Sequence, residues 1–240
     1  MYYIITDIHS CFEELEELLA LNTNNYQIVA LGDYIDRGNY PVETLKKMMS
    51  ITDNGGIALL GNHDDKLMRA LKGNKVKIGH GLGDTLDKLY KEPKSFQNDV
   101  LKWLEERPYK AILDSDNLIV AHAGLKEDLQ DKDSKKAKSF ALYGDVENKD
   151  EMNAQIPEEL KGIVHSILPK RKDWAQEYSG RRWVVHGHTP MLEPRELNKV
   201  VCIDTKCFGG FSLTALEYLG HDKDKTFKSI KAKKVYYENN

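Results

Sequence analysis

Short apolar runs recur along the 240-residue chain, and each of them ends in a polar loop. The runs are only four or five residues long, which is typical of buried strands and too short for helices. They are rich in Val, Ile and Tyr, residue types that favour strands. We therefore expect strands over residues 2–6, 27–31, 56–60, 117–121, 182–185 and 199–203.

Helical patterns lie between several of these strands. Residues 11–21 place Phe12, Leu15, Leu18 and Leu19 on one face of a helix. A second helix over residues 41–49 would begin at a proline, which is favoured at the first helical position. Further helices are expected over residues 67–71, 82–89 and 100–103. This alternation predicts an α/β fold with largely parallel strand pairing and central β-sheets flanked by helices.

The C-terminal half is less regular. Residues 126–138 and 147–161 are charged and weakly patterned, so we interpret them as loops or as a helical excursion over the site. In the tail, residues 226–237 alternate apolar and basic positions, which is typical of an edge strand protected by lysine. We find no composition shift that would mark a boundary, and we expect residues 1–240 to form a single domain.

The amino-acid composition and net charge argue against several classes of protein. A hydrophobic share of 40% supports a real core, and a net charge of −3 argues against general nucleic-acid binding without excluding a nucleotide substrate. Three cysteines are too few and too uneven for a disulfide framework, which favours a reducing cytoplasm. The chain begins without the pattern of a secretion signal and contains no apolar run long enough to span a membrane. The oligomeric state is left open.

Polar side chains that bind metals follow the predicted strands. In open α/β sheets the carboxyl ends of parallel strands meet at one edge, where ligands bind. Segments far apart in the sequence would therefore bring their polar groups into one crevice. The candidate donors are Asp7, His9, Asp33, Asn62, His122 and His188.

This donor set combines oxygen and imidazole without cysteine, which suits two divalent transition-metal ions, with Mn favoured over Fe or Zn. Six donors are too many for one tetrahedral site. They match two ions about 3.5–4 Å apart, an arrangement that activates water for attack on phosphorus. Asp33 is the natural bridge between the ions, because a carboxylate offers several lone pairs.

The loop sequence LGDYIDRGN supplies further chemistry. The guanidinium of Arg37 matches phosphate oxygens, so we assign it to substrate binding and catalysis. His63 follows Asn62 directly and is the candidate general acid. Asp36 could accept a hydrogen bond from His63 and keep its imidazole charged and oriented. Asn62 is a candidate for contacting the substrate as well as a metal.

Five segments, TDIHS, GDYIDRG, GNHD, VAHAG and HGHTP, resemble the signature motifs of the PPP-type (phosphoprotein phosphatase) metallophosphoesterases, in family order. Three further segments, KIGHGLGDTLDKL, WAQEYSG and CIDTKCFGGFSLTALE, resemble a bacterial branch of this family. That branch contains asymmetric diadenosine-tetraphosphatase-like proteins and the phosphatase module of polynucleotide kinase–phosphatase. The resemblance implies a calcineurin-like metallophosphoesterase sandwich with its site at the carboxyl ends of the strands.

The resemblance also implies how the donors divide between the metals. Asp7, His9 and Asp33 would hold one ion, and Asp33, Asn62, His122 and His188 the other. The sequence departs from the family pattern at Thr6, Ser10, Asp64 and Lys206, where glycine, glycine, glutamate and glycine are usual. No ligand is lost, so the departures bear on substrate preference and not on catalysis.

Several residues keep two interpretations. The family pattern favours His188 over His186 as the ligand, because His188 precedes Thr-Pro. The bacterial branch has an arginine shortly before its Trp-Ala pair, so Arg171 is either a second phosphate-binding residue or a solvated charge. Asp204 either orients a metal histidine or belongs to a turn. His80 lies in GHGLGD, which lacks the spacing of a nucleotide-binding glycine loop.

Four functions compete. The leading hypothesis is hydrolysis of phosphomonoesters, with phosphoserine or phosphothreonine peptides as substrates. The second is asymmetric cleavage of dinucleoside tetraphosphates, and the third is processing of RNA ends or 2′,3′-cyclic phosphates. A non-catalytic binding scaffold would require lost ligands, and none is lost. The motifs bind the phosphate and not the group beyond it, so the sequence does not rank the first two.

Overall fold

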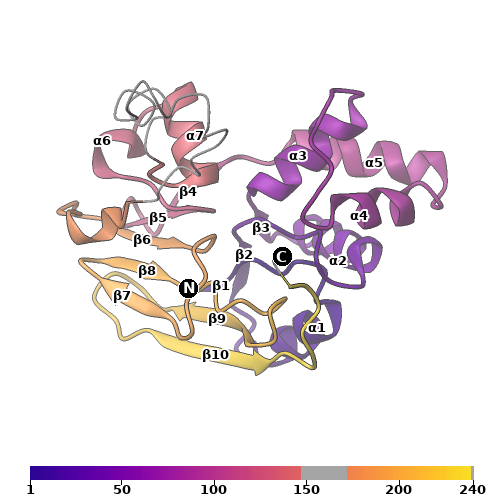
Figure 1. Cartoon of the computed structure of the whole chain (residues 1–240). Coiled ribbons are helices and arrows are strands. Elements are labelled where there is room, and N and C mark those ends of the chain that lie inside the picture. The colour runs from indigo at the N-terminus through magenta and orange to yellow at the C-terminus, as the bar shows by residue number, and fades with distance from the viewer. Residues whose placement is uncertain (147–171, 239–240) are drawn as a thin grey trace, which may run out of the picture.

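Two five-stranded β-sheets pack against each other in the computed structural model, which describes residues 1–146 and 172–238 (Figure 1). The first sheet has the strand order β10-β9-β1-β2-β3, and the second has the order β4-β5-β6-β8-β7. The first sheet consists of β1 (Tyr2–Ile5), β2 (Gln27–Ala30), β3 (Ile57–Ala58), β9 (Ser212–Tyr218) and β10 (Thr226–Lys231). The second consists of β4 (Lys110–Leu113), β5 (Leu118–Ala121), β6 (Trp183–His186), β7 (Arg195–Leu197) and β8 (Val200–Cys202).

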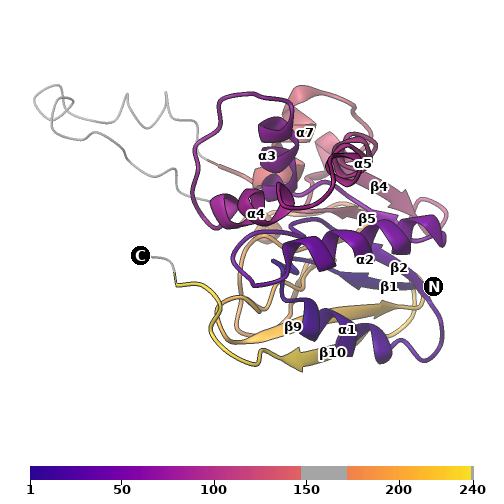
Figure 2. The same ribbon diagram turned by 90° about the vertical axis from the view of Figure 1, so that its right-hand side faces the viewer.

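Helices cover the outer faces of this sandwich, and α1 and α2 lie against the first sheet (Figure 2). The helices that pack on the first sheet and on one another are α1 (Phe12–Ala20), α2 (Pro41–Asp53), α3 (Asn62–Leu71), α4 (Leu82–Leu89) and α5 (Lys94–Glu105). The second sheet is covered by α6 (Glu127–Gln130), α7 (Lys135–Tyr143) and the 3₁₀ turn η2 (Trp174–Gln176). The predicted α/β sandwich with flanking helices is confirmed.

The prediction of largely parallel pairing is wrong, because both sheets are mixed. The central pairs β1–β2, β2–β3, β5–β6 and β6–β8 are parallel. Antiparallel partners extend each sheet: β9 and β10 continue the first, and β4 and β7 flank the second. Short connections explain the difference, since neighbouring strands such as β4 and β5 can pair directly only in antiparallel order.

All six predicted strands are present within one or two residues of their predicted bounds, although β3 has only two residues. The predicted edge strand in the tail is confirmed as β10. The predicted helices are also present, but α3 begins at Asn62 and not at Leu67. Within residues 126–138 the helical interpretation is confirmed, because α6 and the start of α7 lie there. Residues 147–161 lie outside the described part of the chain.

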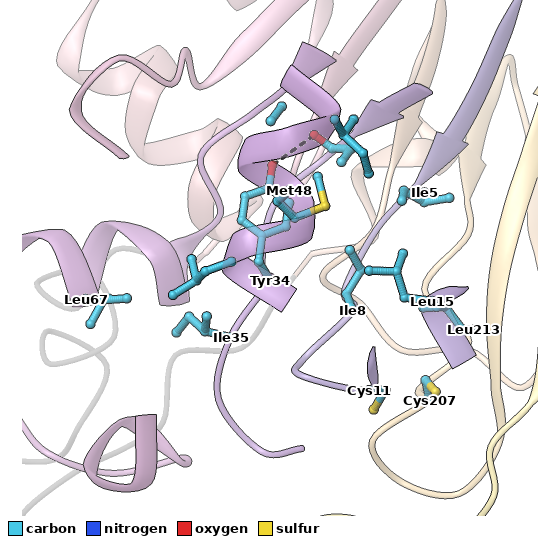
Figure 3. Packing of buried hydrophobic residues seen from close by; sticks show 14 of the residues in the cluster. Ile5, Ile8, Cys11, Leu15, Tyr34, Ile35, Met48, Leu67, Cys207 and Leu213 are labelled. Atoms are coloured by element: carbon cyan, nitrogen blue, oxygen red, sulfur yellow. Dashed lines mark hydrogen bonds between the residues drawn. The ribbon is translucent and has the colours of Figure 1, made fainter. Parts of the chain in front are cut away.

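Three hydrophobic clusters hold the layers together. The first lies between the first sheet and α1–α5, and Figure 3 shows Ile8, Leu15, Tyr34 and Met48 among its members. A second joins the second sheet to α6, α7 and η2. The third lies between the two sheets and contains the residues Ile4, Val29, Leu31, Leu59, Leu118, Val120, Val185, Val201, Ile203, Leu216 and Tyr218. This packing fixes the carboxyl ends of the parallel strands of both sheets beside each other.

Among the described residues, no helix is long and apolar enough to cross a membrane.

Candidate metal centre and phosphate pocket

The predicted donors meet where the parallel strands of the two sheets end. Asp7 and His9 follow β1, Asp33 follows β2, and Asn62 opens α3 just after β3. From the second sheet, His122 follows β5 and His188 follows β6. Several loop residues here have positive φ, among them Asp7, His9, Asp33, Asp36, Arg37 and His188. Such backbone strain is common where a fold holds side chains for function.

Asp33 lies at the centre of the donor cluster. Its Oδ2 is 3.6 Å from Nε2 of His9 and 3.4 Å from Nε2 of His122. The carboxylate is buried, and its Oδ1 accepts a hydrogen bond from the backbone N–H of His63 (2.9 Å). The carboxylate of Asp33 therefore faces both histidines, as a bridging ligand must.

His9 presents a lone pair toward this carboxylate. Its Nδ1 lies 3.0 Å from the carbonyl of Ile35, so Nδ1 carries the proton and Nε2 is an acceptor. Arg37, which has only donors, contacts that Nε2 at 2.8 Å and thereby supports the same tautomer. Oδ1 of Asp7 lies 3.7 Å from Nε2. The first half of the cluster, made of Asp7, His9 and the shared Asp33, thus combines two carboxylates with an imidazole lone pair.

The second half of the cluster is formed around His122. Its Nε2 is 3.0 Å from Oδ1 of Asn62 and 3.0 Å from Nδ1 of His188, in addition to the contact with Asp33. Donor atoms from four separate segments therefore meet at His122, and those of Asp33, His122 and His188 lie within 4.8 Å of one another, a spacing that suits a metal ion. Burial opposes a charge on His122, but the carboxylates of Asp33 and Asp7 outweigh it and raise the pKa to about 9. The cluster attracts positive charge, so these residues fit a divalent cation.

Asp64 holds the loops of the cluster in place. The fully buried carboxylate accepts hydrogen bonds from the backbone N–H groups of Asp33 (2.6 Å), Tyr34 (3.0 Å) and Gly61 (2.9 Å). A Cβ on Gly61 would lie 2.2 Å from the backbone nitrogen of Asp33, so the two loops approach as closely as they do only because residue 61 is glycine. In the sequence Asp64 stood out only as a departure from the family pattern, and its structural role was missed.

His63 and Asp36 form a short, buried pair. Nδ1 of His63 lies 2.6 Å from Oδ2 of Asp36, and Oδ1 of Asp36 accepts a second hydrogen bond from the hydroxyl of Thr85 (2.7 Å). Nε2 of His63 faces Arg37, whose Nη2 is 3.2 Å away. The predicted contact between His63 and Asp36 is therefore present in the structure. Thr85, on α4, was not singled out in the sequence, although it lies in the bacterial-branch segment KIGHGLGDTLDKL.

Arg37 lies over the ring of Phe208, with its guanidinium carbon 4.1 Å from the ring centroid. Its Nε is buried and has no hydrogen-bond partner among the described residues. Together with Asp33, Asn62 and His63 it lines a cavity of about 300 Å³ that opens in front of the donor cluster. A guanidinium that packs on an aromatic face and has unused N–H groups can donate hydrogen bonds to phosphate oxygens. Phe208 was not singled out in the sequence, although it lies in the bacterial-branch segment that ends at Glu217.

The remaining candidate residues, His186, Asp204 and His80, occupy different positions relative to the donor cluster. His186 turns away from the cluster: its ring lies 5.6 Å from Trp174, and burial lowers its pKa to about 4. The carboxylate of Asp204 borders the cavity. It accepts a hydrogen bond from the backbone N–H of Lys206 (2.9 Å), as in a turn. No hydrogen bond joins it to a histidine within the described ranges. His80 lies in the segment GHGLGD, which lacks the spacing of a nucleotide-binding glycine loop, and its side chain nevertheless lines the cavity.

Arg171 lies outside the described residues. The three cysteines are buried and free, as expected for packing residues in a chain without a disulfide framework.

The fold and the donor cluster define a class of protein. Residues 2–192 match the family model of the calcineurin-like phosphoesterases. The chain therefore belongs to the calcineurin-like phosphoesterase family, and it is a metal-dependent phosphoesterase.

Two relatives of known name are similar to this chain over most of its length. The chain is 36% identical over 233 residues to the asymmetrical bis(5′-nucleosyl)-tetraphosphatase PrpE of Bacillus subtilis, covering 90% of each chain. It is 35% identical over 249 residues to the PrpE of Oceanobacillus iheyensis, with 97% of this chain and 93% of the relative covered. The predicted resemblance to this branch is confirmed.

Solved structures agree on the fold. A candidate diadenosine tetraphosphatase matches with a TM-score of 0.67 and 20% identity, over 96% of this chain and 93% of its own. A serine/threonine protein phosphatase from Saccharomyces cerevisiae matches with a TM-score of 0.61 and 13% identity, over 97% and 80%. At these identities the likeness concerns the fold alone.

Proposed function

We propose that this protein is a dinuclear, Mn(II)-preferring hydrolase that cleaves dinucleoside tetraphosphates asymmetrically. The observation that carries the proposal is the position of Asp33 between two donor groups, at 3.6 Å from His9 and 3.4 Å from His122. The substrate class follows from the relatives, which are about a third identical over nearly the whole chain and are named for this activity.

We assign Asp7, His9 and Asp33 to one ion, and Asp33, Asn62, His122 and His188 to the other. When bound, two divalent ions supply a water nucleophile at neutral pH and neutralise charge on the phosphoryl group. Mixed oxygen and imidazole donors favour Mn, with Fe and Zn as the alternatives. The protein's own residues position these donors, because backbone contacts such as that of Asp64 with Asp33 fix the loops.

Arg37 binds the phosphate oxygens in this proposal. Its guanidinium stands in the cavity wall beside both His9 and His63. Asn62 lines the same cavity and is placed to contact the phosphate as well. A bidentate guanidinium orients the phosphoryl group toward the donor cluster, which makes the attack effectively intramolecular.

A second function, hydrolysis of phosphomonoesters, is favoured by the pair of His63 and Asp36. Oδ2 of Asp36 lies 2.6 Å from Nδ1 of His63 and orients the ring, which places Nε2 to give a proton to a leaving oxygen. A serine alkoxide needs that proton, whereas a leaving nucleoside triphosphate is already a stable anion. The pair therefore adds more to the hydrolysis of a phosphoserine peptide than to that of a tetraphosphate.

A product-resolved assay tests the proposal. The purified protein, supplied with Mn(II), is given diadenosine tetraphosphate, a phosphoserine peptide and a 2′,3′-cyclic nucleotide in separate reactions. We expect ATP and AMP from the first substrate, at a kcat/KM above that of the other two. Two ADP molecules, or a higher kcat/KM for the peptide, would contradict the assignment. Chelation should abolish activity, and Mn(II) should restore it as two ions bind per chain.

We also propose that residues 1–240 form one domain and that the protein works in the cytoplasm. Ile4 and Val29 of the first sheet belong to the same buried cluster as Val120 and Val185 of the second, which supports a shared core. Three free thiols support a reducing compartment. One cooperative unfolding transition, seen equally by far-UV circular dichroism and tryptophan fluorescence, is expected. Two separate transitions would show that the sheets fold independently.

A further inference from the structure

The loop that carries His188 also lines a second cavity, which has a volume of about 200 Å³. His186, Thr189 and Met191 line this second cavity, whereas His188 and Pro190 of the same loop line the phosphate cavity. Thr189 and Pro190 are neighbours in the chain, so their Cα atoms lie only about 3.8 Å apart. The loop is therefore a wall of both cavities, and a ligand that occupies one of them can extend across it toward the other.

Backbone contacts hold this shared wall in place. The thiol of Cys202, which lines the second cavity, donates to the carbonyl of Thr189 at 3.3 Å. The N–H of Met191 donates to the carbonyl of Asp204, a residue of the phosphate cavity, at 2.9 Å. The position of the second cavity relative to the phosphate cavity is thus fixed by the fold.

The interior of the second cavity is apolar and has a rigid aromatic wall. The ring of Trp174 packs edge-on against Phe140 and Tyr178, with centroids 5.7 Å and 5.9 Å apart. A Cβ on Gly124 would lie 2.2 Å from the same ring, so the indole has no room to turn on that side. Cavities for drug-sized ligands measure about 300–1,000 Å³, so about 200 Å³ suits a single ring system and not a whole nucleotide.

His186 gives this apolar cavity a hydrogen-bond acceptor. Its Nδ1 lies 2.9 Å from the carbonyl of Gly187, so Nδ1 carries the proton and Nε2 has a lone pair. Nε2 remains accessible, and it accepts no hydrogen bond from any residue in the ranges 1–146 and 172–238. An accessible acceptor on the wall of an apolar cavity favours a flat ligand with an N–H donor at its edge. Adenine has such a donor in its exocyclic amino group.

The charged residues of the lining lie at the surface. The guanidinium of Arg195 binds the carboxylate of Asp173 through two contacts, at 3.0 Å and 2.7 Å, so these charges compensate each other. Lys172 also lines the cavity and is exposed. The buried part of the lining contains the small apolar residues Ala175 and Val200. The interior therefore suits an uncharged ring better than a phosphate.

We propose that this second cavity, the base cavity, binds one adenine base of a dinucleoside polyphosphate whose phosphates occupy the phosphate cavity. The inference rests on the proposed function of the phosphate cavity. The base packs against Trp174, and its exocyclic amino group donates to Nε2 of His186. The polyphosphate chain crosses the loop at Thr189 and Pro190. The base cavity thereby adds recognition of the nucleoside, which the phosphate-binding residues do not supply.

Calorimetric titration with nucleosides tests the base cavity without turnover, because a nucleoside carries no phosphate. The full chain is titrated with adenosine and separately with inosine, in which a carbonyl replaces the exocyclic amino group. We expect a Kd for adenosine on the order of 0.1–1 mM. The Kd for inosine should be about tenfold higher, because its carbonyl and Nε2 of His186 are both acceptors.

Two variants locate the binding to the base cavity. His186→Phe keeps a ring but removes the acceptor, so adenosine should bind about tenfold more weakly and no better than inosine. Ala175→Leu fills the cavity and should raise the Kd for both nucleosides by about tenfold or more. The Kd of Ala175→Leu for orthophosphate, measured with Mn(II), should stay within about twofold of the wild-type value if the phosphate cavity is intact.

His221→Phe is the matched control, because it makes the same substitution at a histidine outside the lining of both cavities. It should leave the Kd values for both nucleosides unchanged. The base cavity would be overturned by equal Kd values for adenosine and inosine in the wild type, or by a preference for adenosine that survives in His186→Phe. Unchanged adenosine binding in Ala175→Leu would also overturn it. Failure to cleave diadenosine tetraphosphate, with the adenosine preference intact, would contradict the proposed function and not the base cavity.

Discussion

His9 and His122 both face Oδ2 of Asp33, one from each half of the donor cluster, and both are fully buried. Burial, together with the neighbouring guanidinium of Arg37, lowers the pKa of His9 well below its ordinary value. The pKa of His122 is instead raised to about 9, because Asp33 and Asp7 outweigh its burial.

The difference comes from what else each half contains. The half around His9 is crowded by Arg37 and His63, which line the phosphate cavity. Among the described residues, His122 draws its polar contacts from Asn62, His188 and the shared carboxylate of Asp33. We infer that the first half handles the anionic substrate as well as an ion, while the second mainly holds an ion. The predictions below separate these roles.

The largest effect is expected for Asp33→Asn, since Asp33 is shared by both halves. The change keeps the volume and removes the charge, so kcat/KM should fall by about 10³-fold or more, equivalent to about 4 kcal/mol. Metal analysis should show fewer than two ions per chain. Asp7→Asn and His122→Asn are the paired controls, each of which should weaken the binding of one ion only. If Asp33→Asn retained two ions and full activity, the bridging role would be wrong.

The next effect concerns His63, which belongs to the half that handles substrate. His63→Asn should lower kcat for a phosphoserine peptide by about 10²-fold, the lower part of the range for a general acid. Hydrolysis of p-nitrophenyl phosphate should fall far less, because nitrophenolate leaves without a proton. Two ions should remain bound. Equal losses on both substrates, together with a lost ion, would instead make His63 a metal ligand.

A smaller effect is expected for Arg37→Ala. If Arg37 acts mainly in the transition state, kcat and kcat/KM should fall together, by about 10–10²-fold. If it mainly binds the ground state, KM should rise and kcat should be spared. Arg37→Lys, which keeps the charge but not the two-pronged geometry, separates charge from orientation. Loss of metal from Arg37→Ala would show that the residue supports the loop and not the substrate.

The smallest effect is expected for Thr85, which acts only through Asp36 and is therefore a positioning residue. Thr85→Val removes the 2.7 Å hydrogen bond at nearly constant volume and should lower kcat for the phosphoserine peptide by about 3–10-fold. Thr85→Ser, which restores the hydroxyl, should recover most of the loss. The effect should again be weaker with p-nitrophenyl phosphate. A loss of equal size on both substrates, with no recovery in Thr85→Ser, would indicate a general packing defect.

The sequence predicted most elements, and its errors have identifiable causes. The strands β4 and β7 were missed because they are half-polar edge strands, only three or four residues long and only partly buried. Only the start of helix α7 fell within the stretch given a helical interpretation, because its apolar residues Ala137, Phe140 and Ala141 straddle the end of a lysine-rich stretch. Their spacing of three and four residues was a signal that could have been used.

By itself, the sequence determined which residues could form the donor cluster. Asp7, Asp33 and His122 each follow a buried strand, and the pleat and direction of parallel strands send such residues to one edge. The type of donor then limits the metal. These inferences require only local pattern and elementary coordination chemistry.

Only the tertiary structure decided how the donors differ. Nothing local distinguishes His9 from His122, since their pKa values depend on charges that arrive from distant segments. The contact of Thr85 with Asp36 spans 49 positions, and that of Asp64 with Asp33 spans 31. Electrostatic and hydrogen-bond energies depend on separation in space and on burial, and both are set when the two sheets pack together.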